Sequence, residues 1–426
     1  MIDIRLLRDA PEAMRAALAR RHPDLVGSVD RMLAVDASRR ELLRTVEHLK
    51  AERNTKSSEV AGRKQAGTDA SDLLEELKVL SARIKSLDEA MRAVDAELEG
   101  ALLRVPNPPL PHVLRGDASA NQVVRTWGEA GTLPFAAQTH WDLGTALGIL
   151  DLPTGAKLTG SGFPLFAGQG ARLVRALTGF MLDLHTAEHG YTEIAPPYLV
   201  NADSARGTGQ LPDHQSEMYV TTDGFYLIPT AEVPLTNIHR DDVLRDADLP
   251  IAYVAYTPCF RREAGAHGKD TRGLIRVHQF DKVELVRFVR PEDSPAELER
   301  LLGHAETVLQ RLEVPYRVVA LATGDLGFAS AQTYDLEVWA PGVAMWLEVS
   351  SASTFTDFQA RRANIRYRST PDAKPSFVHT LNASGVALPR TIIALMENHQ
   401  QEDGSIRIPA ALVPYVGTDR LTRGDA

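Results

Sequence analysis

TPCFRREAGAHGKDTRGLIRVHQFDKVELV, residues 257–286, decides the fold. Successive side chains of a β-strand point to opposite faces, so residues two apart share a face. On this pattern a strand over 275–285 has one polar and one apolar face, carrying respectively Arg276, His278, Phe280, Lys282 and Glu284, and Ile275, Val277, Val283 and Leu285. A preceding strand places Cys259, Arg261 and Glu263 together in the same way. We therefore expect two antiparallel strands joined by a long hairpin loop over 264–270.

The polar face of this hairpin has two interpretations. A charged strand face can simply be solvated. It can also bind an anionic, ring-containing ligand, because guanidinium groups bind phosphates, an aromatic face stacks on a base and a carboxylate pairs with an ammonium. The stretch alone leaves both open.

Composition narrows the class of protein. The chain has 426 residues, 44% hydrophobic and 24% charged, which is ordinary for a globular protein of two or three domains. Its single cysteine, Cys259, excludes an internal disulfide and a cysteine-based zinc framework, and fits a reducing cytoplasm. A net charge of -9 argues against general polyanion binding but allows a local basic patch. We expect no secretory signal and no membrane segment, since the N-terminus lacks an apolar core and no run of ~18 apolar residues occurs.

The N-terminal region predicts a long helical hairpin. Between Leu73 and Leu98 apolar residues alternate at spacings of four and three, which is typical of a coiled coil. An earlier helix is expected from Val29 to Val60, with Arg53 and Lys56 at positions of its seam where apolar residues would be usual. Residues 62–69 form a turn by composition.

The charge of this arm is uneven. Residues 39–64 hold eight Lys/Arg and four Glu. The excess fits either a solvated coiled-coil surface or a probe that touches a phosphate backbone.

A proline-rich segment, PNPPLP over 106–111, marks the best domain boundary. Beyond it we expect an amphipathic helix from Arg172 to His185, strands at 191–200, 226–230, 334–341 and 344–351, and a last helix over 389–398. Strands in runs, without regular βαβ alternation, predict an α+β fold with a mostly antiparallel sheet.

Several alternative motifs fail. Gly160-Ser161-Gly162 and Gly168-Gln169-Gly170 do not continue as a dinucleotide fingerprint or a P-loop. Cys259 fits a small packing residue better than a nucleophile. The thirteen histidines show no HExxH-like spacing, so no zinc is expected.

Taken together and in order, the motifs resemble those of bacterial-type seryl-tRNA synthetases over essentially the whole chain. LKAERN (49–54) is similar to that family's arm, and GYTEIAPPYLV (190–200) resembles motif 1 of class II synthetases, with Pro197 at a dimer interface. The opening stretch resembles motif 2, and LNASGVALPRTIIALMENHQ (381–400) resembles motif 3. GTGQLP (207–212), PTAEVPLTN (229–237) and EVSSASTFTDFQARR (348–362) are also family-like. Pro389 stands where many members have Gly.

The resemblance implies a fold and a domain plan. The fold is α+β, a class II synthetase-like antiparallel sheet flanked by helices, preceded by an antiparallel coiled-coil arm. Residues 1–105 would form a tRNA-binding domain with the arm at about 29–103, residues 106–112 a linker, and residues 113–426 the catalytic domain.

It also implies a reaction. A serine–tRNA ligase activates L-serine with ATP to seryl-adenylate and transfers serine to the 3′ end of tRNA(Ser), and also to tRNA(Sec). By analogy the catalytic residues are Arg261, Glu263 and Arg390. Arg261 would contact the α-phosphate, Arg390 the γ-phosphate, and Phe280 the adenine. The full ATP-binding set is Arg261, Arg262, Glu263, Arg276, Val277, Phe280, Glu348, Val349, Ser350, Ser351 and Arg390.

The remaining expectations concern serine, metal and RNA. Serine would be bound by Thr230, Ala231, Glu232, Arg261, Glu284 and Ser384. Glu348 and Ser351 are candidate Mg²⁺ ligands, since this hard ion prefers oxygen donors, although Glu348 could also be a strand-end carboxylate without metal. The arm would contact RNA through Arg39, Arg40, Arg44, Lys50 and Arg53. A cytoplasmic homodimer is expected.

Two other functions stay open on the sequence. One is a synthetase-like ligase that charges a carrier protein, although such relatives tend to lack the arm. The other is a non-catalytic tRNA-binding homologue, against which the intact Arg261, Glu284 and Arg390 argue.

Overall fold

The computed structural model describes residues 1–131, 133–264 and 272–423 and divides the chain into two compact units, Met1–Pro106 and Asn107–Ala426. Most of the hairpin loop expected over 264–270 lies outside the described residues. No helix in the described ranges combines the length and apolarity needed to cross a bilayer.

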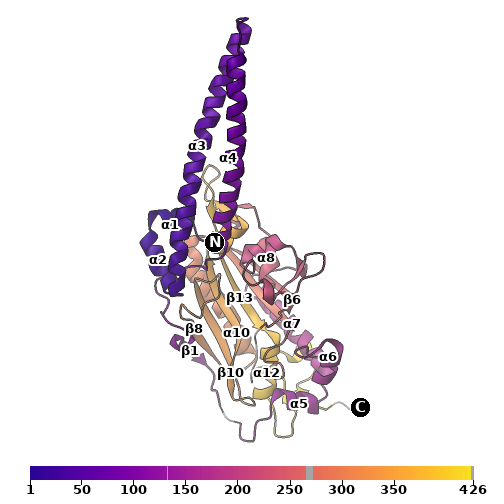
Figure 1. Cartoon of the computed structure of the whole chain (residues 1–426). Coiled ribbons are helices and arrows are strands. Elements are labelled where there is room, and N and C mark those ends of the chain that lie inside the picture. The colour runs from indigo at the N-terminus through magenta and orange to yellow at the C-terminus, as the bar shows by residue number, and fades with distance from the viewer. Residues whose placement is uncertain (132, 265–271, 424–426) are drawn as a thin grey trace. The chain divides into compact units, whose positions relative to one another are not determined.

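The first unit is a helical hairpin with two short helices at its base (Figure 1). Its helices are α1 (Ile4–Asp9), α2 (Pro11–Ala19), α3 (Val26–Gln65) and α4 (Ser71–Leu103). At ~1.5 Å per residue α3 is about 60 Å long and α4 about 50 Å. The predicted antiparallel arm is therefore confirmed, and its first limb runs a turn further at each end than expected.

Two apolar clusters hold the limbs together, and an ion pair fills the gap between them. Leu49 packs on Leu80 and Ile84, and Val60 packs on Leu73 nearer the tip. Lys56 forms an ion pair with Glu76 of the other limb. It occupies a seam position where an apolar residue would be usual. The lysine stem can cover apolar surface while its ammonium stays at the rim.

The second unit is built on an eight-stranded sheet in the order β1-β8-β9-β10-β13-β7-β6-β2. All neighbours are antiparallel except β2 and β6. In sheet order the strands are Gln122–Trp127, Tyr316–Ala320, Gln332–Ala340, Met345–Thr356, His379–Ala387, Gln279–Val289, Ile251–Phe260 and Thr192–Glu193. This confirms the predicted antiparallel α+β sheet.

Helices cover the sheet. The longer ones are α7 (Gln169–Ala187), α10 (Ser294–Arg311) and α12 (Leu388–Asn398), which pack on the central strands. The short helices are α5 (His140–Ala146), α6 (Leu152–Thr159), α8 (Ala202–Thr208), α9 (Glu232–Asn237), α11 (Phe358–Ala363) and α13 (Val413–Val416). Small ladders complete the unit: β3 (Leu199–Val200) with β4 (Tyr226–Leu227), β5 (Val243–Arg245) with β11 (Arg366–Arg368) and β12 (Ser376–Phe377), and β14 (Ile406–Arg407) with β15 (Arg420–Leu421).

The two faces of β7 divide as the alternation predicts. Val283 and Leu285 are fully buried in the main core with α10 and α12. Lys282 and Glu284 point to the other face and are also buried. Helices thus pack on the apolar face of β7, while its polar side chains lie on the opposite face of the sheet.

The strand ends differ from expectation. β6 stops at Phe260 and β7 starts at Gln279, so Arg261, Glu263 and Arg276 lie in loops. Glu263 has a positive φ of 48°, which ends the extended backbone. The segments at 191–200 and 226–230 contain only two-residue strands. Period two was therefore extended too far at the strand ends that face the loop, and in the segments at 191–200 and 226–230.

The apolar stripe of α7 is covered by its own chain. Leu173, Leu177, Phe180 and Leu184 all lie in the main core. Strands β6 and β7 pack on the helix, so this stripe needs no partner subunit to be buried.

The proline-rich segment is bonded to the second unit. The Asn107 side chain donates to the carbonyls of Phe355 (2.8 Å) and Ala329 (2.9 Å), and its backbone N–H donates to the carbonyl of Phe328. These buried bonds fix the start of the sheet-containing unit.

Candidate active site

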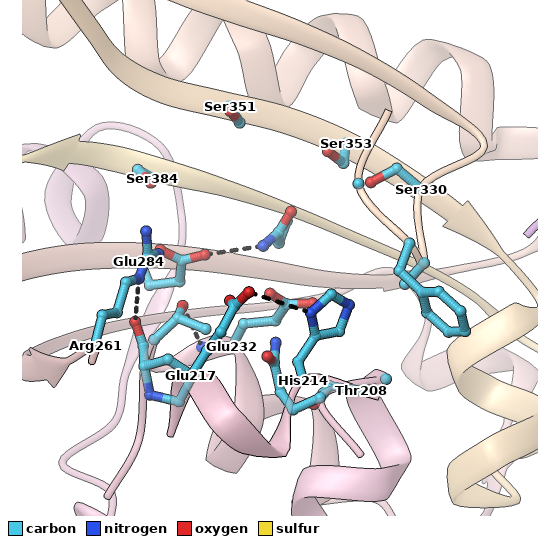
Figure 2. Close-up of a pocket in the computed structure, with 18 of the residues that line it drawn as sticks. Thr208, His214, Glu217, Glu232, Arg261, Glu284, Ser330, Ser351, Ser353 and Ser384 are labelled. Atoms are coloured by element: carbon cyan, nitrogen blue, oxygen red, sulfur yellow. Dashed lines mark hydrogen bonds and ion pairs between the residues drawn. The ribbon is translucent and has the colours of Figure 1, made fainter. Parts of the chain in front are cut away.

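A cavity of about 530 Å³ opens on the polar face of the central strands. Figure 2 shows Arg261, Glu232 and Glu284 close together, with Ser384 on the strand next to Glu284 and Ser351 and Ser353 on the strand beyond it. A smaller recess of about 80 Å³ adjoins it and shares Arg261, Glu263 and Arg390 with it. The two together offer one site with a wide and a narrow part.

The narrow part has the features of a nucleotide-base site. Val277, Phe280, Val349 and Pro389 give it apolar walls. The Arg261 guanidinium lies 5.1 Å from the centre of the Phe280 ring, within cation–π range. A small, partly apolar recess beside arginines suits a base joined to phosphates.

Three arginines surround the junction of the two parts. Arg261 donates from Nε to the carbonyl of Pro229 (3.4 Å), and Arg276 pairs with Glu263 at 2.6 Å. Arg390 lies in the first turn of α12 and donates to the carbonyls of Ile275 (3.0 Å) and Glu348 (2.8 Å). Backbone carbonyls thus orient two of the guanidinium groups, which suits them for bidentate binding of phosphate.

The wide part holds a buried polar network. Lys282 pairs with Glu284 at 2.5 Å and donates to the Thr230 hydroxyl at 2.9 Å. The Asn382 amide donates to Glu284 Oε1 at 2.9 Å. A buried charge is tolerated where it is paired and hydrogen-bonded. Such a network rejects ligands that would leave its members unpaired.

Glu232 is the most perturbed carboxylate of the cavity. It begins α9 and lies almost wholly inside the protein. Burial, and then the nearby charge of Glu284, raise the pKa of Glu232 to about 7. A ligand ammonium beside it would restore the charged form, so the position suits an amino group.

A second pair of carboxylates, Asp335 and Glu348, lies at the end of the site where Arg390 lies. The Ser351 hydroxyl lies between the two carboxylates, 2.5 Å from Asp335 Oδ1 and 3.2 Å from Glu348 Oε1. Burial and the neighbouring Glu348 raise the pKa of Asp335 to about 8. Two carboxylates and a hydroxyl are oxygen donors of the kind Mg²⁺ takes when substrate phosphates complete its shell. Within the described ranges no three His, Cys, Asp or Glu side chains converge on a metal position.

The structure brings most of the expected residues together. The two parts of the site are lined by Thr230, Glu232, Arg261, Glu263, Arg276, Val277, Phe280, Glu284, Glu348, Val349, Ser351, Ser384 and Arg390. Among the described residues, three that were expected in the site line neither of its two parts. Ala231 is buried, Ser350 is buried and donates to the carbonyl of Ser384 (2.6 Å), and Arg262 is exposed.

The sequence analysis assigned no role in the site to Asn382, Asp335 or Lys282. Lys282 was visible on the polar face, but its pairing with Glu284 was not. Asp335 and Asn382 come from β9 and β13, which the sheet order places beside β10 and β7. The register of the strands places these residues beside the site; for example, Ser351 lies opposite Asp335.

Cys259 is fully buried, and that burial raises the pKa of its thiol. It is a packing residue, as expected, rather than a nucleophile.

Family models match both units. Residues 1–109 match the seryl-tRNA synthetase N-terminal domain, and residues 219–399 match the tRNA synthetase class II core domain (G, H, P, S and T). The serine–tRNA ligase of Trichlorobacter lovleyi is 53% identical over 99% of this chain and 100% of its own length. The chain belongs to the seryl-tRNA synthetase family.

Other members of the seryl-tRNA synthetase family agree. The serine–tRNA ligase of Gemmatimonas aurantiaca is 53% identical over 98% of this chain and 99% of its own. The crystal structure of seryl-tRNA synthetase from Pyrococcus horikoshii complexed with ATP superposes with a TM-score of 0.93 at 39% identity, covering all of both chains. The match therefore includes the arm as well as the sheet.

Proposed function

We propose that this chain is a serine–tRNA ligase that makes seryl-adenylate in the cavity and transfers serine to transfer RNA. The observation that carries the proposal is the joined site, in which arginines border an apolar recess and buried carboxylates border the wider space. ATP fits the first and an amino acid the second. The full-length family relationship supports the same activity.

In the first step, a serine carboxylate oxygen bonds to the α-phosphorus of ATP, and the bond to pyrophosphate breaks. No proton needs to move. The chain's own work is to hold both partners in line and to stabilise the negative charge. Arg261 would meet the α-phosphate from beside Phe280, and Arg390 the far end of the triphosphate.

In the second step, the terminal ribose hydroxyl of the RNA attacks the serine carbonyl carbon, AMP leaves, and the hydroxyl proton goes to the departing phosphate. Serine would be held by its ammonium at Glu232 and by its hydroxyl near Glu284 and Ser384. Threonine carries the same hydroxyl, so its exclusion must be steric.

Mg²⁺ would be held by Glu348, Asp335 and Ser351 together with ATP oxygens, and when bound it would neutralise phosphate charge. The side chains fit such an ion because all three are oxygen donors linked by hydrogen bonds. Asp335 extends the expected set of Glu348 and Ser351.

The partners proposed for this chain are ATP, L-serine, tRNA(Ser) and a second copy of itself. Because ATP and transfer RNA are cytoplasmic molecules, we place the enzyme there. We also propose that residues 1–105 bind RNA, partly through Arg39, Arg40, Arg44, Lys50 and Arg53, and that residues 113–426 carry out catalysis. Charging of tRNA(Sec) is proposed on the family relationship alone.

ATP–pyrophosphate exchange with a panel of amino acids tests the function, followed by charging of tRNA(Ser), tRNA(Sec) and a carrier protein. Serine-dependent exchange with transfer to tRNA(Ser) is the expected result. Exchange driven by another amino acid, or transfer to the carrier alone, would contradict it. The complete arm argues against the carrier-protein ligase, and the assembled cavity argues against a non-catalytic homologue.

A further inference from the structure

Behind the wall of the serine cavity lies a buried glutamine that has no role so far. Gln359 belongs to α11 (Phe358–Ala363) and its side chain is fully buried. It is separated from the cavity by Glu232, whose carboxylate it contacts. A buried amide needs partners for two N–H groups and a carbonyl, so its bonds are informative.

All its polar groups are engaged, and the partners belong to three other elements. Nε2 donates to Glu232 Oε1 at 2.6 Å and to the carbonyl of Thr208 at 3.3 Å. Oε1 accepts from the Thr380 hydroxyl at 2.8 Å. These partners lie on α9, at the end of α8 and on β13.

The contacts fix which way the amide faces. Turning the amide over would put its oxygen against Glu232 Oε1 and the Thr208 carbonyl, which are both acceptors. The Thr380 hydroxyl, in turn, has a hydrogen to give to Oε1. Gln359 therefore presents N–H groups to Glu232, and these stabilise an ionised carboxylate more than a protonated one.

We propose that Gln359 is a positioning residue of the serine site, which keeps Glu232 ionised and turned so that its other oxygen, Oε2, receives the substrate ammonium. This inference rests on the proposed function, because it assumes that serine occupies the cavity.

The charges around Glu232 explain why such a residue is needed. Burial and Glu284 raise its pKa, while the hydrogen bond from Gln359 and the charges of Lys282 and Arg261 act in the opposite direction. Lys282 is already paired with Glu284 at 2.5 Å. The Gln359 bond is therefore the direct support for the charged form of Glu232.

Gln359 also connects the carboxylate to the segment that bounds the cavity. Thr208 and Gly209 line the cavity, and Gly209 ends α8 with a φ of 100°. One turn along α11, Arg362 donates to the carbonyls of Arg206 and Leu211. If Gln359 were only part of this scaffold, its loss would disturb the pocket for both substrates. The positioning role instead predicts a loss confined to serine.

The test compares Gln359→Met with Gln400→Met. Methionine keeps the length and roughly the volume of glutamine without its amide. Gln400 is a matched control: it is buried, its Nε2 donates to the carbonyls of Glu397 (2.8 Å) and Gln138 (3.1 Å), and its Oε1 accepts from the Gln138 backbone N–H (2.8 Å). It lines neither part of the site in the described residues.

Serine-dependent ATP–pyrophosphate exchange is measured from pH 6 to 9, and thermal melting checks folding. In Gln359→Met the KM for serine should rise about tenfold or more, the effect of one hydrogen bond to an ionised group. The KM for ATP should change less than about threefold. Because Glu232 loses a bond that lowers its pKa, the acid limb of kcat/KM for serine should move to higher pH. Gln400→Met should show neither change.

Thr380→Val provides a second variant, which removes the hydroxyl that orients the amide while keeping the side-chain shape. It should produce a smaller effect of the same kind, and it decides the matter if Gln359→Met does not fold. Equal losses for serine and ATP, or an unmoved pH profile, would overturn the inference while wild-type exchange with serine upheld the function. Absence of serine-dependent exchange in the wild type would overturn both.

Discussion

The proposed chemistry depends most on two side chains, Arg261 and Glu284. They differ in how far the surrounding structure depends on them. Arg261 lies at the end of β6, with a 3.4 Å bond to a backbone carbonyl and a ring beneath it. Glu284 lies inside β7 and is paired with a buried lysine. Their variants must therefore be chosen differently.

Arg261→Ala should strongly slow adenylate formation without unfolding the protein. A preorganised cation at the centre of charge development contributes on the order of 10²–10³ in rate, and we expect a loss of that size. Serine-dependent pyrophosphate exchange measures it, with Arg245→Ala as control. Arg245 pairs with Asp248 on the surface, its side chain 81% exposed. Near-normal exchange in a folded Arg261→Ala protein would contradict the assignment.

For Glu284 the informative change is to glutamine. Alanine would leave Lys282 buried without its counter-charge, which costs about 3–5 kcal/mol and confuses folding with binding. Glu284→Gln also removes the counter-charge of Lys282, but it keeps the side-chain volume and one oxygen that can accept from Lys282 Nζ, while its amide nitrogen replaces the oxygen that Asn382 meets. We expect the KM for serine to rise about tenfold or more, with ATP affinity nearly unchanged.

The control for this change is Glu306→Gln. Glu306 is also a buried, ion-paired carboxylate, bonded to Arg125 at 2.6 Å, but it belongs to α10 and lines neither part of the site in the described chain. An equal or greater loss of ATP affinity in Glu284→Gln would show that the residue serves the nucleotide instead.

At the scale of elements, the sequence predicts best where one period continues unbroken. Leu73 to Leu98 shows the coiled-coil spacing, and α4 follows it. Inside β7 the alternation of Val283 and Leu285 with Lys282 and Glu284 assigns each side chain to its correct face. It fails at Glu263 and Arg276, because loop residues that reach a ligand obey no strand period.

Pairing between distant segments is what local patterns could not reveal. Gln359 meets Glu232 across 127 positions, and Ser351 meets Asp335 through the register of β9 and β10. Family-like motifs marked many of the cavity residues, but not these supporting bonds. The buried stripe of α7 shows a related limit: an apolar face indicates that something covers it, not which element does.

The small β3–β4 ladder offers a better position for a dimer contact than α7. Tyr198 and Leu199 are 44% and 48% exposed, and two residues beside β4 are also exposed: Val220, which is bridged to Tyr226, and Phe225, which precedes the strand. Neighbouring exposed apolar side chains of this kind mark association surfaces. Leu199→Asp should therefore weaken the proposed homodimer, since it would bury a charge there.

Sedimentation velocity over a range of concentrations checks this prediction, with Val243→Asp as a matched control. Val243 is 40% exposed on β5. We expect the wild type and the control to sediment as dimers, and Leu199→Asp to shift toward monomer. A wild type that is monomeric and active at assay concentrations would refute the dimer itself.

For the whole molecule, the charge of the arm needs a revised account. The basic excess at 39–64 is matched on the other limb, where α4 carries four Lys/Arg and eight Asp/Glu. Arg39 pairs with Asp95, Arg40 with Asp36 and Lys50 with Asp88. The arm is therefore not a uniformly basic probe, and RNA must compete with these pairs, of which Arg39–Asp95 and Lys50–Asp88 are largely exposed and individually weak.

The structure indicates where the arm can be cut off and its two limbs joined. Arg39 Nε lies 2.5 Å from Asp95 Oδ1, so the limbs are adjacent there and a short Gly/Ser connection from Arg40 to Asp95 can replace residues 41–94. This keeps the bonds of buried Asp36 to Arg8 and Arg40. The sheet-containing unit has its own core, so it should still fold and still make seryl-adenylate.

Transfer to RNA should collapse in this variant, because limbs of about 50–60 Å can reach a part of the RNA far from the acceptor end. Backbone contacts are largely electrostatic, so RNA binding by the intact chain should weaken as salt rises, with a shallower slope after truncation. Pyrophosphate exchange, charging kinetics and binding at several salt concentrations separate the steps. The double change Arg44→Glu and Arg53→Glu should lower charging and leave exchange intact. If the truncated chain charged RNA with near-normal efficiency, the arm would be a structural element only, and RNA recognition would have to lie in the sheet-containing unit.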